Sequence, residues 1–587
     1  MKLFDHHVTG KELMQLYSQN NFDEVCKRII DMLHDFESSC YTSIGSVDQS
    51  ILDDTVAAIL FIFSQSEFNI PENHIPTLIT MNHLMANLIA VSSYETTDSL
   101  LRHIMHQTGN FAKILVMYSC RNQPMFNQDV FFDLNSKLAT LWWITYSASS
   151  CGSPTKLLAD NISRHYSKIP DKFNMVLLLT SPAYFDCTYA IPQKDREIKT
   201  VLNQQIRNRV PYFKTPVKTS KKKIAVITGR WYPTSAVYKS SAHQLEALGK
   251  KYDLTLVHLG VDSESLAKTQ FKDVICTGDI SKGNLDLSIF QKLDCHLAYI
   301  PDVGMSNESV ILANLRLAPI MVTGYGHPSS TFGSLCDYYI GGQETEVAEK
   351  ALENYSERLV LVPGLGAHPV FPNYTRRNPS FERPIINCAW TSPKINYTML
   401  CNLRKILDRV PNSMVRLFPA WTIGRYNSMI PCIRDLTQMF GDEFVLLPEL
   451  PYEDYLIELE KGTIALDSWP FGGYNTIVDS FFVGCPALAI EGTRFYNRAS
   501  SALLRRVGLS NLVCKSQEEY VDKAVELLTK SEKLEEARSQ VASVDRLKSL
   551  LCDNDEPQWF VKAFDFILEN HNLIQKSRDK GPFYVDL

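Results

Sequence analysis

The sequence lacks the signatures of secreted, membrane-spanning and metal-binding proteins. Its 14 cysteines are scattered, and none forms a CxxC pair or a cysteine–histidine cluster with the spacing of a metal site. There is no run of about eighteen apolar residues to form a membrane-spanning helix. The first residues (MKLFDHHVTGKEL) contain no apolar signal region. We therefore expect a reduced, cytoplasmic protein without a membrane span.

Motifs of several enzyme classes are also missing. The chain has no GxGxxG after an apolar strand, no Walker A lysine, no GxSxG and no HExxH, and no acidic pair stands out as a metal site. These absences argue against P-loop hydrolases, α/β-hydrolases and zinc proteases. The net charge of −6 argues against a general nucleic-acid binder. We interpret the lysine cluster Lys218–Lys223 (KTSKKK) as a solvated linker.

The first part of the chain has the pattern of a helical domain. At 587 residues the chain is too long for one core, and typical domain lengths suggest about three or four domains. From Lys11 to about Arg207, apolar residues recur at three- and four-residue spacing, and β-strand signals are scarce. We predict an all-α domain over residues 1–215, either a bundle or a degenerate solenoid, because no clean tetratricopeptide repeat is found.

After Lys223, short β-rich runs alternate with helical stretches. The runs IAVIT, YDLTLVHL, APIMVTGYG and RLVLVP come before a break near Tyr374–Arg383, and the same alternation then restarts. Strands that alternate with helices imply a parallel sheet covered on both faces. We predict two Rossmann-like domains, over residues 216–378 and 379–587, with a ligand cleft at the carboxyl ends of their strands. The predicted fold class is α plus α/β.

The stretch Gly462–Arg498 contains the strongest candidate for a binding loop. After a short apolar run, a turn with Gly472 and Gly473 leads into a helix that begins near Asn475. The glycines let the backbone approach a ligand, and the first N–H groups of the helix point to the same place, which suits a diphosphate. Asn475 and Asp479 are four residues apart and share one helix face. The alternative is an ordinary crossover with a glycine turn.

A lysine follows another predicted strand of the second half. Lys394 lies in the turn TSPK, directly after the run PIINCAW. A lysine at the carboxyl end of a strand can reach a bound phosphate as a point charge, although most lysines are surface residues. Thr391 and Ser392 either donate to the same anion or cap the following helix.

The first half contributes a second turn of interest. The segment Gly324–Gly333 (GYGHPSSTFG) ends an apolar run and contains His327. This histidine is a general acid or base, a phosphate ligand or a turn residue. Asp302, in the run YIPDVGM, is expected near the edge of the cleft. Two open α/β domains that lack the P-loop, GxGxxG, GxSxG and HExxH motifs fit a metal-independent nucleotide-sugar transferase.

The order of these motifs resembles a known glycosyltransferase family. The runs YIPDVGM and LANLRLAPIMVTGYGHPSSTFGSLCDYYIGGQE, followed by TSPKINYTML, VRLFPAW, LPYEDYL and WPFGGYNTIVDSFFVGCPALAIEG, resemble the family that includes eukaryotic O-GlcNAc transferase and bacterial HMW1C-like N-glycosyltransferases. The resemblance covers most of Ile224–Leu528, and the helical front part is similar in architecture to the HMW1C-like branch. It implies a GT-B type fold and an inverting cytoplasmic enzyme that moves a hexose, usually glucose, from a UDP-sugar onto a protein. In the bacterial branch the acceptor is asparagine in Asn-x-Ser/Thr sequons of secreted adhesins, and no cofactor besides the UDP-sugar donor is expected.

The resemblance also implies roles for individual residues. Those expected to bind the nucleotide or its diphosphate are Thr391, Lys394, Phe471, Gly472, Gly473, Asn475 and Asp479, and His327 matches the GHP turn of the family.

One segment departs from the family pattern. The family has a histidine just after the first strand of its first half, where this chain reads WYPTSAVYKSSAHQL and places Ser240 or Ser241. His243, slightly further on, would replace that histidine only if the local path shifts, and we take it with Lys394 and His327 as a catalytic candidate. The departure leaves two alternatives open: another acceptor, such as a Ser/Thr hydroxyl or a glycan, or a non-catalytic partner subunit.

Overall fold

The computed structural model describes most of the chain. The described residues are 9–37, 44–106, 109–149, 152–175, 181–191, 194–210, 213, 222–278, 285–379, 382–419, 429–552 and 555–585. Within these ranges, no helix combines the length and the apolar character that a membrane span needs.

The chain forms two compact units, and each unit is built from three separate segments of the sequence. The first unit consists of Met1–Ile191, Thr391–Cys401 and Pro419–Glu449, and the second of Pro192–Trp390, Asn402–Phe418 and Leu450–Leu587.

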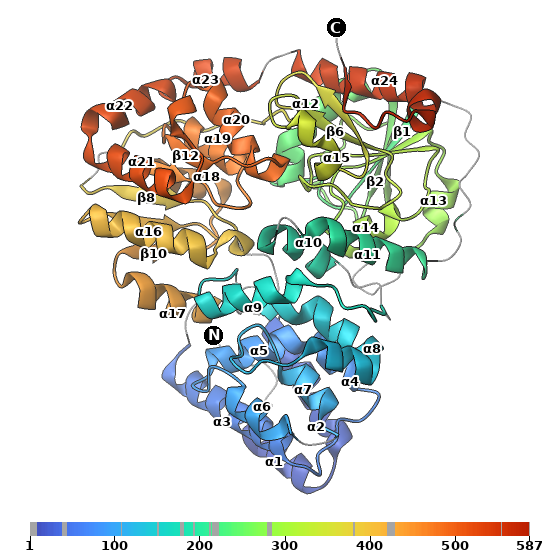
Figure 1. Cartoon of the computed structure of the whole chain (residues 1–587), viewed down its shortest axis with the longest axis vertical. Helices are drawn as coiled ribbons and strands as arrows, with labels where there is room; N and C mark the ends of the chain where they lie inside the picture. The colour runs from blue at the N-terminus through green and yellow to red at the C-terminus, as the bar shows by residue number, and fades with distance from the viewer. Residues whose placement is uncertain are drawn as a thin grey trace. The chain divides into compact units, whose positions relative to one another are not determined.

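The first unit is almost entirely helical (Figure 1). Its helices are α1 (Gly10–Ser18), α2 (Phe22–Glu37), α3 (Ser46–Ser64), α4 (Ile75–Thr80), α5 (Asn82–Val91), α6 (Asp98–Ile104), α7 (Phe111–Met117), α8 (Gln128–Thr145), α9 (Lys156–Ser167), α10 (Ser181–Ala190) and α17 (Met429–Phe440), with the short strand β10 (Phe444–Leu446). The apolar stripes of these helices form its core, where Trp142, Trp143 and Tyr146 are fully buried. The Trp142 indole donates a hydrogen bond to the Tyr118 carbonyl at 2.8 Å, so these aromatic residues are structural.

A second segment of this unit is the turn that carries Lys394. The turn is the short 3₁₀ helix η4 (Ser392–Lys394). The backbone N–H of Ser153 donates to the Ile395 carbonyl at 2.8 Å. Gly152 has a φ of +68°, and a Cβ placed there would lie 2.1 Å from the Ile395 oxygen. Only glycine therefore lets residue 152 pack against this turn.

The second unit contains two parallel sheets. The first sheet has the order β14-β7-β6-β5-β4-β1-β2-β3. Its strands are β1 (Lys223–Thr228), β2 (Asp253–His258), β3 (Asp273–Cys276), β4 (Leu297–Ile300), β5 (Ile320–Thr323), β6 (Tyr338–Gly342), β7 (Arg358–Val362) and β14 (Phe583–Tyr584). In the second sheet, the strands of this unit follow the order β9-β8-β11-β12-β13. They are β8 (Ile385–Cys388), β9 (Met414–Leu417), β11 (Ile464–Leu466), β12 (Ala487–Ile490) and β13 (Val513–Cys514).

Helices accompany both sheets. They are α11 (Asp195–Arg207), α12 (Ala236–Gly249), α13 (Ser288–Lys292), α14 (Asn307–Ala313), α15 (Ala351–Asn354), α16 (Tyr397–Arg409, which begins in the first unit), α18 (Tyr452–Glu460), α19 (Asn475–Phe482), α20 (Ala499–Arg506), α21 (Gln517–Thr529), α22 (Ser531–Gln540), α23 (Val544–Leu551) and α24 (Glu556–Lys576). The fold class predicted from the sequence is confirmed, because helices precede two parallel sheets with helices between their strands.

The end of the chain returns to the first sheet. Helix α24 lies beside α12 (Figure 1), and Phe564 shares one buried core with Val226 of β1 and Leu245 of α12. Strand β14 pairs in parallel with β7, with Phe583 opposite Val360. The sequence-based boundaries instead place all of 379–587 in the second Rossmann-like domain. The apolar face of α24 explains the difference, because it is buried against the first sheet and not the second.

The predicted boundary at residues 215 and 216 lies outside the described residues, as does most of the lysine cluster Lys218–Lys223.

The contact between Gly152 and the Lys394 turn predicts a stability effect. Gly152→Ala should destabilise the protein because the new Cβ meets carbonyl oxygens as well as a left-handed backbone. Gly109→Ala is the matched control, since Gly109 has a φ of +94° but open space around its Cβ. The control should cost about 1–3 kcal/mol for its backbone strain. Gly152→Ala should cost about 1–3 kcal/mol more for the steric overlap. Urea and thermal denaturation measure both variants, and equal losses would contradict the packing argument.

Candidate active site

A buried carboxylate organises the glycine loop of the second half. Asp467 follows β11, and its Oδ1 accepts a hydrogen bond from the Gly473 N–H at 2.8 Å. The Ser500 hydroxyl donates to Asp467 Oδ2 and also contacts the Gly473 carbonyl at 2.7 Å. The Tyr520 hydroxyl donates to the Asp467 carbonyl at 2.6 Å. The loop between β11 and α19 is therefore held from several sides. The sequence analysis missed Asp467, although its place at the carboxyl end of a strand is a usable signal.

The two glycines of this loop pack against that carboxylate. A Cβ at Gly472 would lie 2.6 Å from Asp467 Oδ2, and a Cβ at Gly473 would lie 2.3 Å from the Thr476 hydroxyl. The sequence suggested that these glycines make room for a ligand. The structure gives a further reason, because the protein's own side chains occupy the space that a Cβ would need.

Phe471 joins the glycine loop to the first half. Its ring stacks on that of Tyr496, with centroids 5.0 Å apart and planes at 3°. The His327 ring lies 6.4 Å away on a nearly parallel plane. The His327 backbone N–H donates to the Pro301 carbonyl at 3.3 Å, so the turns after β4 and β5 meet here. The structure thus brings His327 together with the predicted donor loop.

His327 is buried as a neutral side chain. Only 3% of its surface is exposed, and burial, followed by the nearby Lys199 ammonium, holds its pKa well below the usual value of 6.5. A neutral imidazole donates one hydrogen bond and accepts another. It does not bring a positive charge to a phosphate at neutral pH.

Helix α11 supports the His327 turn, which the sequence did not reveal. Lys199 Nζ donates to the Ser329 hydroxyl at 3.0 Å, and Asn203 Nδ2 donates to the Thr331 carbonyl at 2.7 Å. The buried Asp195 pairs with Arg494 at 2.8 Å. Although α11 lies in the helical front part of the sequence, it belongs to the second unit. Its polar face, which reads as solvent-exposed in sequence, satisfies backbone carbonyls of the first Rossmann-like half.

Asp302 is a buried carboxyl at the carboxyl end of β4. The Thr228 hydroxyl, at the end of β1, donates to its Oδ2 at 2.7 Å. Burial raises the pKa of Asp302 to about 6, and the hydrogen bond from Thr228 partly opposes this rise. Asp302 thus lies in the strand-to-turn passage after β4, and its expected position at the edge of a cleft stays a prediction.

Asp479 of α19 contacts a tyrosine that the sequence analysis did not single out. The Tyr452 hydroxyl donates to Asp479 Oδ1 at 2.6 Å, and Lys239 Nζ from α12 lies 3.3 Å from the Tyr452 ring centroid. Burial raises the pKa of Asp479 to about 6, while Lys239 and the Tyr452 hydroxyl lower it. A carboxylate, a phenol and an ammonium thus meet at the first turns of α19.

The start of α19 also reaches the first half directly. Asn475 Nδ2 donates to the Ala236 carbonyl in the first turn of α12 at 3.2 Å. The Tyr474 hydroxyl donates to the Ala367 carbonyl at 2.9 Å. Asn475 and Asp479 lie one turn apart on α19, as their spacing predicts, but their side chains have different partners.

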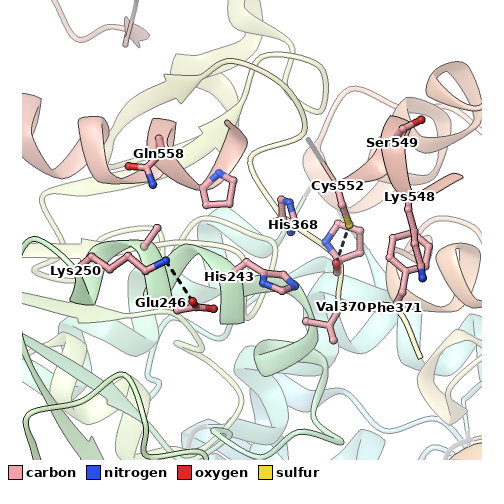
Figure 2. Close-up of a pocket in the computed structure, with 13 residues that line it drawn as sticks. His243, Glu246, Lys250, His368, Val370, Phe371, Lys548, Ser549, Cys552 and Gln558 are labelled. Carbon is pink, nitrogen blue, oxygen red and sulfur yellow. Dashed lines mark hydrogen bonds and ion pairs between the residues drawn. The ribbon is translucent and has the colours of Figure 1, made fainter. Parts of the chain in front are cut away.

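In the departing segment, Ser240, Ser241 and His243 all lie on α12, and the histidine has different surroundings from the predicted nucleotide-binding residues. The Ser240 hydroxyl donates to the Ala236 carbonyl at 3.0 Å, and Ser241 is buried in α12. His243 is exposed and lines a pocket of about 640 Å³ with His368, Lys250 and other residues. Figure 2 shows His243 near His368, and their ring centroids are 4.8 Å apart. None of the predicted nucleotide-binding residues lines this pocket.

Lys394 and Thr391 belong to the first unit, whereas the other predicted nucleotide-binding residues belong to the second. Lys394 is 9% exposed. Its backbone N–H donates to the Thr391 carbonyl at 2.8 Å, which closes the turn. Contact of Lys394 with a nucleotide stays a prediction.

In the second unit, the predicted residues of the glycine loop gather around the start of α19. The first N–H groups of α19 have no partner inside the helix, and a helix N-terminus favours an anion. The glycine loop, His327 and Asp479 lie around that terminus or its supporting loop. Among the described residues, no three His, Cys, Asp or Glu side chains gather in a way that could hold a metal ion.

Comparisons with known proteins agree with this geometry. Residues 375–557 match the model of Glycosyl transferase family 41. The chain is 23% identical to the UDP-glucose:protein N-beta-glucosyltransferase of Actinobacillus pleuropneumoniae serotype 5b (strain L20), covering 87% of this chain and 89% of that protein. It is also 27% identical to the probable UDP-N-acetylglucosamine–peptide N-acetylglucosaminyltransferase SPINDLY of Hordeum vulgare, covering 41% of this chain and 26% of that protein.

A solved structure shares the fold over nearly the whole length. A mutant of the Thermobaculum terrenum O-GlcNAc transferase aligns with a TM-score of 0.61 and 17% identity, covering 96% of this chain and 98% of that chain. This likeness supports a GT-B type fold, in which two Rossmann-like domains follow a helical region along the chain. Together with the sequence similarities, it confirms the resemblance predicted from the motifs. Residues 375–557 thus match Glycosyl transferase family 41, and over most of its length the chain is similar to UDP-glucose:protein N-beta-glucosyltransferases, as the motifs predicted.

Proposed function

We propose that the protein transfers glucose from UDP-glucose to asparagine in Asn-x-Ser/Thr sequons of a protein acceptor, with inversion and without a metal ion. The observation that carries the proposal is the Phe471–Asp479 segment. It lies within the family 41 match, is fixed by the buried Asp467, and leads into the N-terminus of α19. The similarity to a protein named as a UDP-glucose:protein N-beta-glucosyltransferase supports the choice of donor and acceptor.

In an inverting transfer the acceptor attacks the anomeric carbon as UDP leaves. The enzyme must hold both groups in line and neutralise the departing diphosphate. We assign that neutralisation to Lys394 and to the N–H groups at the start of α19. The Asp479 carboxylate accepts hydrogen bonds from the ribose hydroxyls, and Phe471–Gly473 form the wall against the nucleotide. Positioned N–H and ammonium groups supply the charge, so the proposal requires no metal.

His327 orients the sugar or the acceptor in this proposal. Its depressed pKa makes it a weak proton acceptor, and a weak base contributes little to general base catalysis near neutral pH. A neutral imidazole still provides a directional donor and acceptor. Its proximity to the Phe471 ring supports a role for His327 near the donor.

Two other functions remain as alternatives, and the observation behind both is the absence of a histidine at Ser240 and Ser241. One is transfer to a Ser/Thr hydroxyl or a glycan, and the other is a non-catalytic partner subunit. An adhesin-like acceptor and a cytoplasmic location stay predictions of the sequence resemblance. Isolation of modified host proteins and cell fractionation test them.

A transfer assay distinguishes these functions. The purified chain is incubated with UDP-glucose and an Asn-x-Ser/Thr peptide, with and without EDTA, and the products are located by mass spectrometry. We expect hexose on asparagine in both conditions, a β-linkage by NMR, and no product with a peptide in which glutamine replaces the asparagine. Hexose on a hydroxyl would favour the altered acceptor, and UDP binding without transfer would favour the non-catalytic subunit. Loss of activity in EDTA that added metal restores would contradict metal independence.

Removal of the Lys394 charge tests the diphosphate assignment. Lys394→Ala should lower kcat by at least about 100-fold, because one missing charge-stabilising group commonly costs that much. Lys405→Ala is the control, since Lys405 is exposed on α16 of the same half. Circular dichroism and melting temperature establish that both variants fold. Full activity of a folded Lys394→Ala variant would remove Lys394 from the mechanism.

The pKa of Asp479 predicts a pH dependence of donor binding. Because its pKa is raised to about 6, Asp479 is ionised above that pH and protonated below it. A protonated carboxyl accepts ribose hydroxyls less well, so UDP affinity should fall as the pH drops from 7 to 5. In Asp479→Asn the affinity should be lower at pH 7 and should change less over the same range. Calorimetric titrations with UDP measure both, and equal pH dependence in the two proteins would show that another group is responsible.

A further inference from the structure

Lys239 is a half-buried ammonium with unused hydrogen-bonding capacity. Its Nζ lies 3.3 Å from the centroid of the Tyr452 ring. Within the part of the chain that the structure describes, this ammonium makes no hydrogen bond and no ion pair. A lysine ammonium carries three donors, and burial without an anionic partner is unfavourable. Burial accordingly lowers the pKa of Lys239, while the nearby Asp479 carboxylate raises it. The ring face satisfies part of the charge and leaves the donors available.

The position of Lys239 is fixed at the junction of the two halves. Its own carbonyl accepts a hydrogen bond from the Val370 N–H at 2.9 Å. One turn earlier on α12, the Ala236 carbonyl accepts from Asn475 at the start of α19. The ring under the ammonium belongs to Tyr452, whose hydroxyl contacts Asp479. Two hydrogen bonds to backbone carbonyls therefore hold α12, and the Tyr452 ring under the ammonium places Lys239 beside Asp479 of α19.

We propose that Lys239 binds the diphosphate of the UDP-sugar donor, as a cation supplied by the first half to a nucleotide site of the second half. The inference rests on the proposed function and adds a residue to it. An oxyanion at the N-terminus of α19 would receive N–H groups from the helix and the ammonium from α12. It would also supply the hydrogen-bond partners that the ammonium lacks. The donor would then contact both halves, and the departure of UDP would remove the contact that its diphosphate makes between Lys239 and α19.

The choice of the diphosphate over the acceptor follows from what surrounds the ammonium. Tyr452 and Asp479 belong to the half that carries the glycine loop, and Asp479 is the residue expected at the ribose. The first N–H groups of α19 favour an anion at the same end of the helix. An acidic acceptor side chain is the competing partner, and the measurement separates it from the diphosphate.

The test compares ligands that differ only in their phosphates. UDP, UMP and uridine are titrated against the wild-type chain, Lys239→Met, Lys239→Arg and Lys250→Met, with uridine measured by displacement of UDP. Methionine keeps an apolar chain over the Tyr452 ring, and arginine keeps the charge. Lys250→Met is the matched control, because Lys250 is the C-cap residue of α12, where it pairs with Glu246 at 3.3 Å and lines the pocket that contains His243.

Lys239→Met should weaken UDP binding by about 10- to 100-fold, the usual range for one lost charged hydrogen bond, and should change uridine binding by less than about 2-fold. Lys239→Arg should retain most of the UDP affinity, and Lys250→Met all of it. Unchanged UDP binding in folded Lys239→Met would overturn the inference, as would an equal loss for UDP and uridine or a loss confined to the KM of the peptide. A wild-type chain that binds no UDP would overturn the proposed function itself, so the two failures are distinguishable.

Discussion

A buried carboxylate is the constraint on which the donor half depends. Asp467 stands at the end of β11 with little exposure to water, and an ionised group in that position is tolerated only when hydrogen bonds replace its hydration. The Gly473 N–H and the Ser500 hydroxyl provide them. Because these donors belong to the loop and to α20, the loop cannot relax without breaking its hydrogen bond to the carboxylate. The start of α19 is therefore preorganised before any nucleotide arrives, which reduces the ordering required during transfer.

The same burial gives the titratable groups of the site distinct protonation states. His327 loses its positive charge because neither solvent nor a carboxylate stabilises the imidazolium, and Lys199 disfavours it further. Burial raises the pKa of both Asp302 and Asp479 to about 6, and the Thr228 hydroxyl at Asp302 and Lys239 with the Tyr452 hydroxyl at Asp479 offset only part of that rise. Around the start of α19 the structure thus combines the Asp479 carboxyl, the Lys239 ammonium and, across the Phe471 ring, the His327 imidazole. A ligand rich in hydroxyls and phosphate finds partners for both kinds of group.

Local patterns in the sequence predicted the elements of the site but not their long-range partners. The glycine turn, the helix after it and the spacing of Asn475 and Asp479 are encoded within a few residues, and the structure shows each of them. The Ser500 contact with Asp467 joins residues on different elements, so periodicity and spacing carry no signal for it. The support of the His327 turn by α11 is similar, because its polar face looks like a solvated helix until its tertiary partners are known.

His243 also shows that local sequence patterns do not reveal the tertiary surroundings of a residue. It lies one turn after Lys239 on α12, so the two share a helix face. A single turn is enough to change the surroundings, because Lys239 lies over Tyr452 whereas His243 lies beside His368 in a separate pocket (Figure 2). Sequence proximity to the family position favoured the histidine. The structure places Lys239, and not His243, against Tyr452 and near Asp479 of α19.

The serines at the departing segment constrain where acid–base chemistry can occur. The Ser240 hydroxyl already donates to a helix carbonyl, and Ser241 is buried within α12, so neither takes over the proton-accepting role of an imidazole. At the strand ends, burial raises the pKa of the Asp302 carboxyl toward neutrality and depresses that of the His327 imidazole. A base acts best when its pKa lies near the working pH. This turn of α12 therefore offers no imidazole at Ser240 or Ser241 to an acid–base step, whereas the turn after β4 holds a carboxyl with a raised pKa.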